Sequence, residues 1–324
     1  MTFHLSGIDE AGYGPLLGPL VVGLATLRTT DRISPAMPWK LLAPTVVRRK
    51  SSKRGLAIAD SKVLHKGEDL TPLESGVLAF VAAELGAAPP ATFRELIDHL
   101  TAGRSGYLDD YPWYKDNDLP LPHSTPRLEL TGIRRRLERA LAKQQIEVAE
   151  VRAVPLEVTE FNQHLNEQDS KGDVNAWAIG RFLRWLWRQR SRTDADVWVD
   201  RLGGRNRYGP FLYPLFPKAQ FQIIEQGEES QSYEVENSSG DRKLRVHFSK
   251  ECEEISFATA LASMTAKYTR QLHLALFNRW WQEQHPSELT PTAGYWQDAK
   301  RFLADIEPLR KSLQISDQIL VRKR

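Results

Sequence analysis

Three carboxylates follow short apolar runs that are predicted to be strands. Asp9 and Glu10 end the run 3–8, and Asp200 ends the run 197–199. Functional sites of α/β proteins usually lie at the carboxyl ends of strands, and a buried charge is costly unless it is paired or binds a metal. Each acid alone could be a turn or cap residue. The three together favour a site for a divalent cation, and an all-oxygen ligand set favours Mg²⁺ or Mn²⁺ over zinc.

Other common catalytic signatures are absent from the sequence. The glycines at 12, 14 and 18 lack the spacing of a dinucleotide-binding loop, and the element after them is predicted to be a strand rather than a helix. There is no Gly-Lys-Ser/Thr phosphate loop and no Gly-x-Ser-x-Gly turn, and the eight histidines lack metal-binding spacing. The single cysteine, Cys252, excludes a disulfide framework and a Cys-rich zinc site.

The elements that must position the carboxylates alternate between strand and helix patterns. Strands are expected at 3–8, 20–27, 146–154, 197–199 and 221–224, with a hairpin at 233–248. Helices are expected at 71–85, 132–145, 174–190 and 255–284. The pattern predicts an α/β fold. One face of the helix 174–190 carries Arg181, Arg184 and Arg188, for which a solvated face is favoured over phosphate contacts.

Composition is typical of a globular protein. Of 324 residues, 41% are hydrophobic, which is enough for a core, and the net charge of +3 permits a nucleic-acid partner without implying one. The apolar stretch 16–27 is broken by Gly and Pro and is too short to span a membrane. We expect a soluble cytoplasmic monomer with one domain over 1–324, an inserted surface segment at 86–125 and a helical C-terminal tail at 286–324.

Several motifs resemble those of the ribonuclease HII family. The opening signature of that family resembles the run Gly7-Ile8-Asp9-Glu10-Ala11-Gly12-Tyr13-Gly14-Pro15, followed by Gly18-Pro19 and a valine-rich strand. Four more stretches resemble family motifs and follow in the family's order: Asp60-Ser61-Lys62, Val197-Trp198-Val199-Asp200, the segment 260–270 and Gly294-Tyr295. The family has an arginine where this chain has Tyr13.

The resemblance implies a ribonuclease H-like fold, in which helices flank a mixed β-sheet, here with the 86–125 insertion and an extra hairpin at 233–248. It also implies a metal-dependent endonuclease. Such an enzyme would cut the RNA strand of an RNA/DNA hybrid, or cut at a ribonucleotide embedded in duplex DNA. A ribonuclease H-like nuclease with another nucleic-acid substrate, and a non-catalytic nucleic-acid-binding relative, are the alternatives.

By the same resemblance, Asp9, Glu10, Asp200 and a fourth acid would hold two Mg²⁺ or Mn²⁺ ions about 4 Å apart. One ion would activate water, and the other would stabilise the leaving 3′ oxygen. Counting back from Lys267 without a gap places Glu253 at the fourth position, with Glu254 as the alternative. If that stretch is extended, the two side chains point to opposite sides and only one can face the metals.

The resemblance also implies a set of substrate contacts. The backbone of Gly12, Tyr13 and Gly14 would sense the ribose 2′-OH. The motif of Ser61 and Lys62 would bind the substrate, with Lys62 contacting a phosphate. Tyr295 would stack on a neighbouring sugar or base, or else be a packed, half-buried tyrosine.

Overall fold

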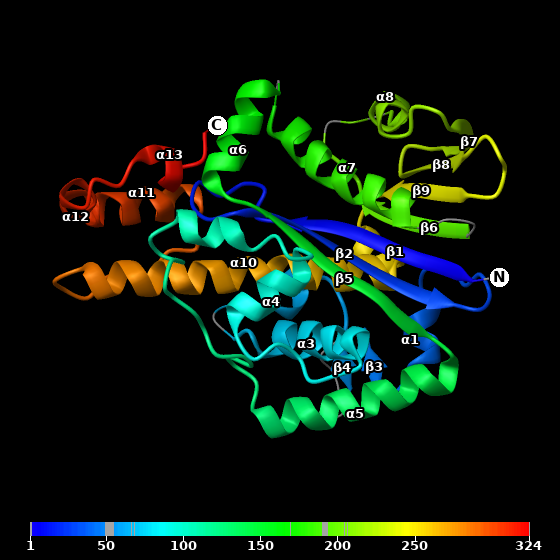
Figure 1. Cartoon of the computed structure of the whole chain (residues 1–324), viewed down its shortest axis with the longest axis horizontal. Helices are drawn as coiled ribbons and strands as arrows, with labels where there is room; N and C mark the ends of the chain where they lie inside the picture. Colours follow the sequence, from blue (N-terminus) through cyan, green and yellow to red (C-terminus); the bar gives the residue numbers. More distant parts are fainter. Residues whose placement is uncertain are drawn as a thin grey trace.

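A mixed β-sheet forms the centre of the molecule in the computed structural model (Figure 1). The structure describes residues 2–48, 55–65, 67, 69–168, 170–189, 194–203, 205 and 207–323. Within these residues, seven strands form the main sheet in the order β5-β2-β1-β6-β9-β8-β7. The strands are β1 (Phe3–Ala11), β2 (Leu20–Thr29), β5 (Glu147–Leu156), β6 (Asp194–Asp200), β7 (Gln220–Gln226), β8 (Ser230–Glu236) and β9 (Lys243–Ser249).

The pairing of the strands confirms the expected mixed sheet. Strand β1 is antiparallel to β2 and parallel to β6, and β2 is antiparallel to β5. Strand β6 is parallel to β9, and β8 is antiparallel to both β9 and β7. The hairpin expected at 233–248 is β8 and β9. It is not an appendage, because β9 lies inside the sheet beside β6. A separate parallel pair consists of β3 (Val46–Val47) and β4 (Leu56–Ala57).

Helices cover both faces of the sheet (Figure 1). One face carries α1 (Met37–Leu41), α2 (Ser61–Leu64), α3 (Thr71–Leu85), α4 (Phe93–Leu100), α5 (Arg127–Gln144) and α10 (Phe257–Gln284). The other carries α6 (Val158–Glu167), α7 (Lys171–Gln189) and α8 (Gly209–Leu212). Strand β2 serves both cores because its side chains alternate: Val21 packs in the α3–α10 core and Val22 in the α7 core. No helix among the described residues is both long and apolar enough to cross a membrane.

Two glycines allow α10 to lie unusually close to the sheet. A Cβ atom on Gly7 in β1 would come within 2.0 Å of the backbone nitrogen of Thr259. A Cβ on Gly23 in β2 would come within 2.3 Å of the carbonyl oxygen of Ala262. Both contacts are with helix backbone, which cannot move aside. The absence of side chains at these positions therefore brings the first turns of α10 against the end of β1.

The segment 86–125 differs from the expected surface insertion. It contains α4 and the 3₁₀ helix Gly106–Asp110, and many of its apolar side chains are buried in the α3–α10 core, among them Phe93, Leu96, Ile97, Leu108, Tyr111, Trp113, Tyr114, Leu119 and Leu121. Its end is fixed by Glu74 of α3. The Glu74 carboxylate accepts hydrogen bonds from the backbone N–H groups of His123, Ser124 and Thr125 at 2.5–2.8 Å. The segment is therefore part of the core.

The tail expected at 286–324 does contain helices, namely α11 (Trp296–Asp305), α12 (Glu307–Ser312) and α13 (Asp317–Leu320). Helix α13 packs against α6. The remaining elements are the one-turn helix α9 (Cys252–Ile255), which lies between β9 and α10, and the 3₁₀ helix Tyr213–Leu215.

Candidate active site

The end of β1 directs two carboxylates to opposite faces of the sheet. Asp9 is only 7% exposed and hydrogen-bonds Ser263 of α10. Glu10, the next residue, hydrogen-bonds Asn175 in the second turn of α7. The alternation of side chains along a strand explains the division. Each layer of helices therefore contributes one polar side chain, Ser263 or Asn175, to the same end of β1.

Asp200 and Glu253 come from the neighbouring part of the sheet. Strand β6 lies beside β1, and Asp200 is its last residue. Its Oδ1 atom accepts a hydrogen bond from the backbone N–H of Cys252 at 3.2 Å. Residues 252–255 form helix α9 rather than an extended stretch. Glu253 is buried there, whereas Glu254 is exposed. Of the two candidates for the fourth carboxylate, Glu253 is the one that faces the others.

The pKa values of the four carboxyls are all raised, in part because the groups lie close together. Burial raises the pKa of Asp9 well above its usual range, and the charges of Glu10, Asp200 and Glu253 raise it further. Burial, together with the charge of Asp200, likewise raises the pKa values of Glu10 and Glu253. The pKa of Asp200 is also raised by burial, although backbone N–H groups of Cys252 and Arg201 oppose this. The charge of Lys62 opposes these shifts, but the pKa values stay raised, so the cluster concentrates negative charge that the surrounding protein balances only in part.

The motif of residues 60–62 lies at the edge of this cluster. Asp60 caps helix α2 by accepting from the backbone N–H of Lys62 at 2.8 Å. The hydroxyl of Ser61 is buried 3.0 Å from that of Ser263. The ammonium group of Lys62 lies 3.9 Å from Glu253, and its side chain is 78% exposed. Ser61 is thus a packing residue as the structure stands, while Lys62 is free to meet a ligand.

The glycine-containing loop and the tyrosine motif lie side by side. Gly12 has a φ of +84°, and a Cβ there would clash with the side chain of Arg270. The carbonyl of Gly294 accepts from the N–H groups of Leu16 and Leu17. The ring of Tyr295 is 57% exposed, with the Arg270 guanidinium 5.9 Å from its centroid. The structure therefore places Tyr295 open to solvent rather than packed.

The other two residues of the loop face outward. Tyr13 is 42% exposed, and partial burial together with the charge of Glu10 raises the pKa of its phenol. Around Gly14 there is open space, since a Cβ there would meet no atom within 4 Å. The loop therefore presents an open surface next to the carboxylate cluster.

Two residues that support the site carried no signal in the sequence. Asn175 lies on a helix predicted only from its apolar face. Arg322, near the C-terminus, donates through Nη2 to the carbonyl oxygens of Gly12, at 2.7 Å, and of Pro15. Ser263 and Arg270 belong to the α10 motif but had no assigned role. Contacts of this kind join positions up to 310 residues apart, so local pattern could not reveal them.

The donor set of the cluster fits a hard divalent cation. Among the described residues, no three His, Cys, Asp or Glu side chains are close enough as they stand to hold a metal ion together. All four side chains nevertheless offer carboxylate oxygens, the ligands that Mg²⁺ and Mn²⁺ prefer. The Oε2 atom of Glu253 is buried without a hydrogen-bond partner. A cation would give this oxygen a partner and reduce the repulsion within the cluster.

Comparisons with known proteins find similarity in structure alone. No family model and no curated protein matches the sequence. A chain of the PCNA:RNase HII complex from Archaeoglobus fulgidus is 14% identical, with a TM-score of 0.46 over 99% of this chain and 94% of that one. The ribonuclease H2 of Pyrococcus horikoshii OT3 is 14% identical (TM-score 0.41; 98% and 92% covered). Bst-RNase HIII, solved with Mn²⁺, is 15% identical (TM-score 0.42; 99% and 66% covered). An activity for this chain must therefore be argued from its own site residues.

Proposed function

We propose that this protein is a divalent-metal-dependent endonuclease that hydrolyses RNA strands paired with DNA, or cuts at single ribonucleotides embedded in duplex DNA. One observation carries the proposal: Asp9, Glu10, Asp200 and Glu253, from two strand ends and a one-turn helix, lie close enough that the other three charges raise the pKa of Asp9. Burial of four carboxylates together opposes folding unless it serves a cation.

The four carboxylates would bind Mg²⁺ or Mn²⁺, which when bound supplies Lewis-acid activation of water and neutralises charge on the leaving oxygen. Ser263 and Asn175 would hold Asp9 and Glu10 in orientation through their hydrogen bonds. Lys62, exposed beside Glu253, would bind a non-bridging phosphate oxygen of the substrate.

Selection of RNA would come from the loop beside the cluster. The backbone of residues 12–14 would contact the ribose 2′-OH, the group that separates RNA from DNA. Tyr295, an exposed ring on the adjacent segment, would stack on a neighbouring sugar or base. Tyr13, in place of the family's arginine, adds no positive charge to this surface.

A cleavage assay tests the proposal. The purified chain is incubated with a DNA duplex containing one ribonucleotide, with a full RNA/DNA hybrid and with all-DNA duplex, each with Mg²⁺, Mn²⁺ or EDTA. Cleavage of the ribonucleotide-containing substrates is expected with metal and not with EDTA. Asp9→Asn should abolish it while far-UV circular dichroism stays unchanged. Full activity of Asp9→Asn, or of the wild type in EDTA, would refute the metal-nuclease assignment.

The same assay separates the two alternatives. Cleavage of the all-DNA substrate at a comparable rate would indicate a nuclease with another substrate. Binding of the hybrid without any cleavage in either metal would indicate a non-catalytic relative.

A further inference from the structure

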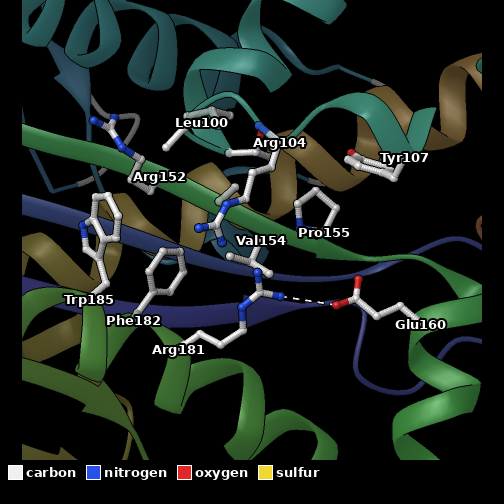
Figure 2. A pocket seen from close by; sticks show the side chains of 13 residues that line it. Leu100, Arg104, Tyr107, Arg152, Val154, Pro155, Glu160, Arg181, Phe182 and Trp185 are labelled. Carbon is white, nitrogen blue, oxygen red and sulfur yellow. Dashed lines mark hydrogen bonds and ion pairs between the residues drawn. The ribbon is translucent and has the colours of Figure 1, made fainter. Parts of the chain in front are cut away.

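A cavity lies at the edge strand β5, and none of the four carboxylates lines it. It has a volume of about 240 Å³ and lies between the segment 100–107, β5, and helices α6 and α7 (Figure 2). Its polar lining is cationic, since it includes the guanidinium groups of Arg104, Arg152 and Arg181 and a single carboxylate, Glu160. A pocket that gathers three arginines at one edge of the fold is not explained by core packing.

Two of these arginines face each other without enough negative charge between them. Figure 2 shows the guanidinium groups of Arg104 and Arg181 pointing toward one another from opposite walls. Arg181 lies 3.3 Å from Glu160, and its side chain is only 27% exposed. Arg104 forms no ion pair with any residue that the structure describes. Burial lowers the pKa of Arg181, the charge of Glu160 opposes this, and the charges of Arg104 and Arg184 lower the pKa further. Like charges held this close create a site for an anion.

The third arginine is already neutralised. Arg152 donates to Glu84 at 2.5 Å, and Glu84 also contacts His99 at 2.9 Å. Arg181 is paired more loosely, at 3.3 Å from Glu160, and Arg104 has no ion-pair partner among the described residues, so the anion would meet Arg104 and share Arg181 with Glu160. Each guanidinium is a planar fork that binds two oxygens at once. A carboxylate has two oxygens and can bind one guanidinium in this way, whereas the three terminal oxygens of a phosphate monoester can bind two guanidinium groups on opposite walls.

The remaining walls are flat and apolar. Phe182 and Trp185 project into the pocket from α7, and Leu100, Val154 and Pro155 line the opposite side. The indole N–H of Trp185 donates to Glu150 at 3.1 Å, which holds the ring in place. Aromatic rings presented beside cationic groups are the arrangement on which nucleobases stack in nucleotide-binding proteins. The volume of about 240 Å³ excludes a duplex and restricts the occupant to a small ligand.

We propose that this pocket binds a nucleoside monophosphate, with the phosphate between Arg104 and Arg181 and the base against Phe182 and Trp185. The site is separate from the carboxylate cluster and uses none of its residues. The two nevertheless share α7, because Asn175, which contacts Glu10, precedes Arg181 by six residues, or about 9 Å of helix rise.

Isothermal titration calorimetry tests the proposal on the full chain in EDTA, so that no metal can recruit phosphate to the carboxylates. Adenosine 5′-monophosphate is titrated beside adenosine and inorganic phosphate. We expect one saturable site for the nucleotide, with affinity at least about tenfold higher than for either fragment, because both halves of the pocket contribute. Arg104→Ala should weaken nucleotide binding at least about tenfold, since it removes one of the two guanidinium groups that would bind the phosphate. Arg104 is exposed on a loop, so the variant should fold normally, which its melting temperature checks.

Arg188→Ala is the matched control, because Arg188 lies on the same helix, is exposed, and does not line this pocket. It should change the dissociation constant less than about twofold. The proposal is overturned if the nucleotide shows no saturation by about 1 mM, or if Arg104→Ala binds as tightly as the wild type. Equal affinity for adenosine and the nucleotide would also overturn it, because the arginines would then have no role.

Discussion

Replacement of Glu253 by Gln tests whether the fourth carboxylate belongs to the site. The two side chains have the same shape, so the change removes the charge and leaves the packing. Glu253 is 7% exposed, and its Oε2 atom has no hydrogen-bond partner. Because a carboxylate in this position would bind a metal directly, turnover should fall at least about tenfold, which corresponds to about 1.4 kcal/mol of barrier. Some activity should remain, since three carboxylates still hold the site.

The same substitution should stabilise the metal-free protein. Burial and the charge of Asp200 raise the pKa of Glu253, so the ionised form at neutral pH opposes folding. Relief of this repulsion should raise the free energy of unfolding of the metal-free protein above that of the wild type. Glu254→Gln is the control. Its side chain is exposed, so turnover should change less than about threefold and stability by less than about 0.5 kcal/mol.

Two measurements on the same protein preparations decide the outcome. Single-turnover cleavage of a ribonucleotide-containing duplex gives the rate, and urea denaturation in EDTA gives the stability. A slower and more stable Glu253→Gln variant would support the assignment. If Glu254→Gln is the damaging change and Glu253→Gln is silent, then the side chain that reaches the metals is not the buried one. If neither variant is impaired, the site works with three carboxylates.

Three other predictions concern different parts of the molecule. Tyr13→Arg should shift substrate preference toward single embedded ribonucleotides, because a well-placed guanidinium adds roughly 1.5–3 kcal/mol to a phosphate contact. The measurement is the ratio of the cleavage rates on the single-ribonucleotide duplex and on the RNA/DNA hybrid. An unchanged ratio would mean that this side chain faces away from the substrate. Gly23→Ala should lower the free energy of unfolding by more than about 2 kcal/mol, because its Cβ would overlap the α10 backbone. Gly14 lies in open space, so Gly14→Ala should lower it by less than about 1 kcal/mol. Equal urea midpoints for the two variants would contradict the close packing of α10. Burial lowers the pKa of His273 from 6.5 to about 4, so protons bind the unfolded chain first and the free energy of unfolding should fall as pH drops from 6.5 toward 4. Replacing His273 with Gln should remove up to about 3 kcal/mol of that pH dependence, measured by urea titrations at several pH values. An identical pH profile for the variant would argue against a neutral buried ring.

The strand ends were predictable because the sequence marks them twice. Apolar runs identify β1 and β6, and an acid follows each run at the point where burial should end. Neighbouring parallel strands place such ends at the same edge of a sheet, which brings Asp9 and Asp200 together. Glu253 came from counting back from Lys267 without a gap, and the structure buries it while Glu254 is exposed. The stretch around it was harder to foresee, because one helical turn carries almost no periodic signal.

The segment 86–125 shows what local pattern cannot reveal. Its prolines and acids are typical of a surface loop, and its aromatic residues follow neither helix nor strand spacing. They are buried because they pack in the core formed by α3 and α10, and Glu74 of α3 fixes three successive backbone N–H groups at the end of the segment. The spacing of Phe93, Leu96, Ile97 and Leu100 after the capping residue Thr92 is a helix signal within the segment. Glu74, in the first turn of an otherwise apolar helix, becomes informative only once its partners are known.

The arginines beneath the glycine-containing loop explain how a tyrosine can stand at position 13. In a trans peptide unit the C=O and the following N–H point in opposite directions. Arg322 draws the Gly12 carbonyl toward the protein interior, so the N–H of Tyr13 is directed away from it. Arg270 draws the Leu17 carbonyl inward in the same manner. Both guanidinium groups are buried, and their bonds to loop carbonyls offset part of the loss of water, since Nε of each arginine and Nη1 of Arg322 have no hydrogen-bond partner among the described residues. Under the proposed function, the loop would therefore contact a ribose hydroxyl through backbone groups that these arginines orient, and the side chain at position 13 could change without loss of that contact.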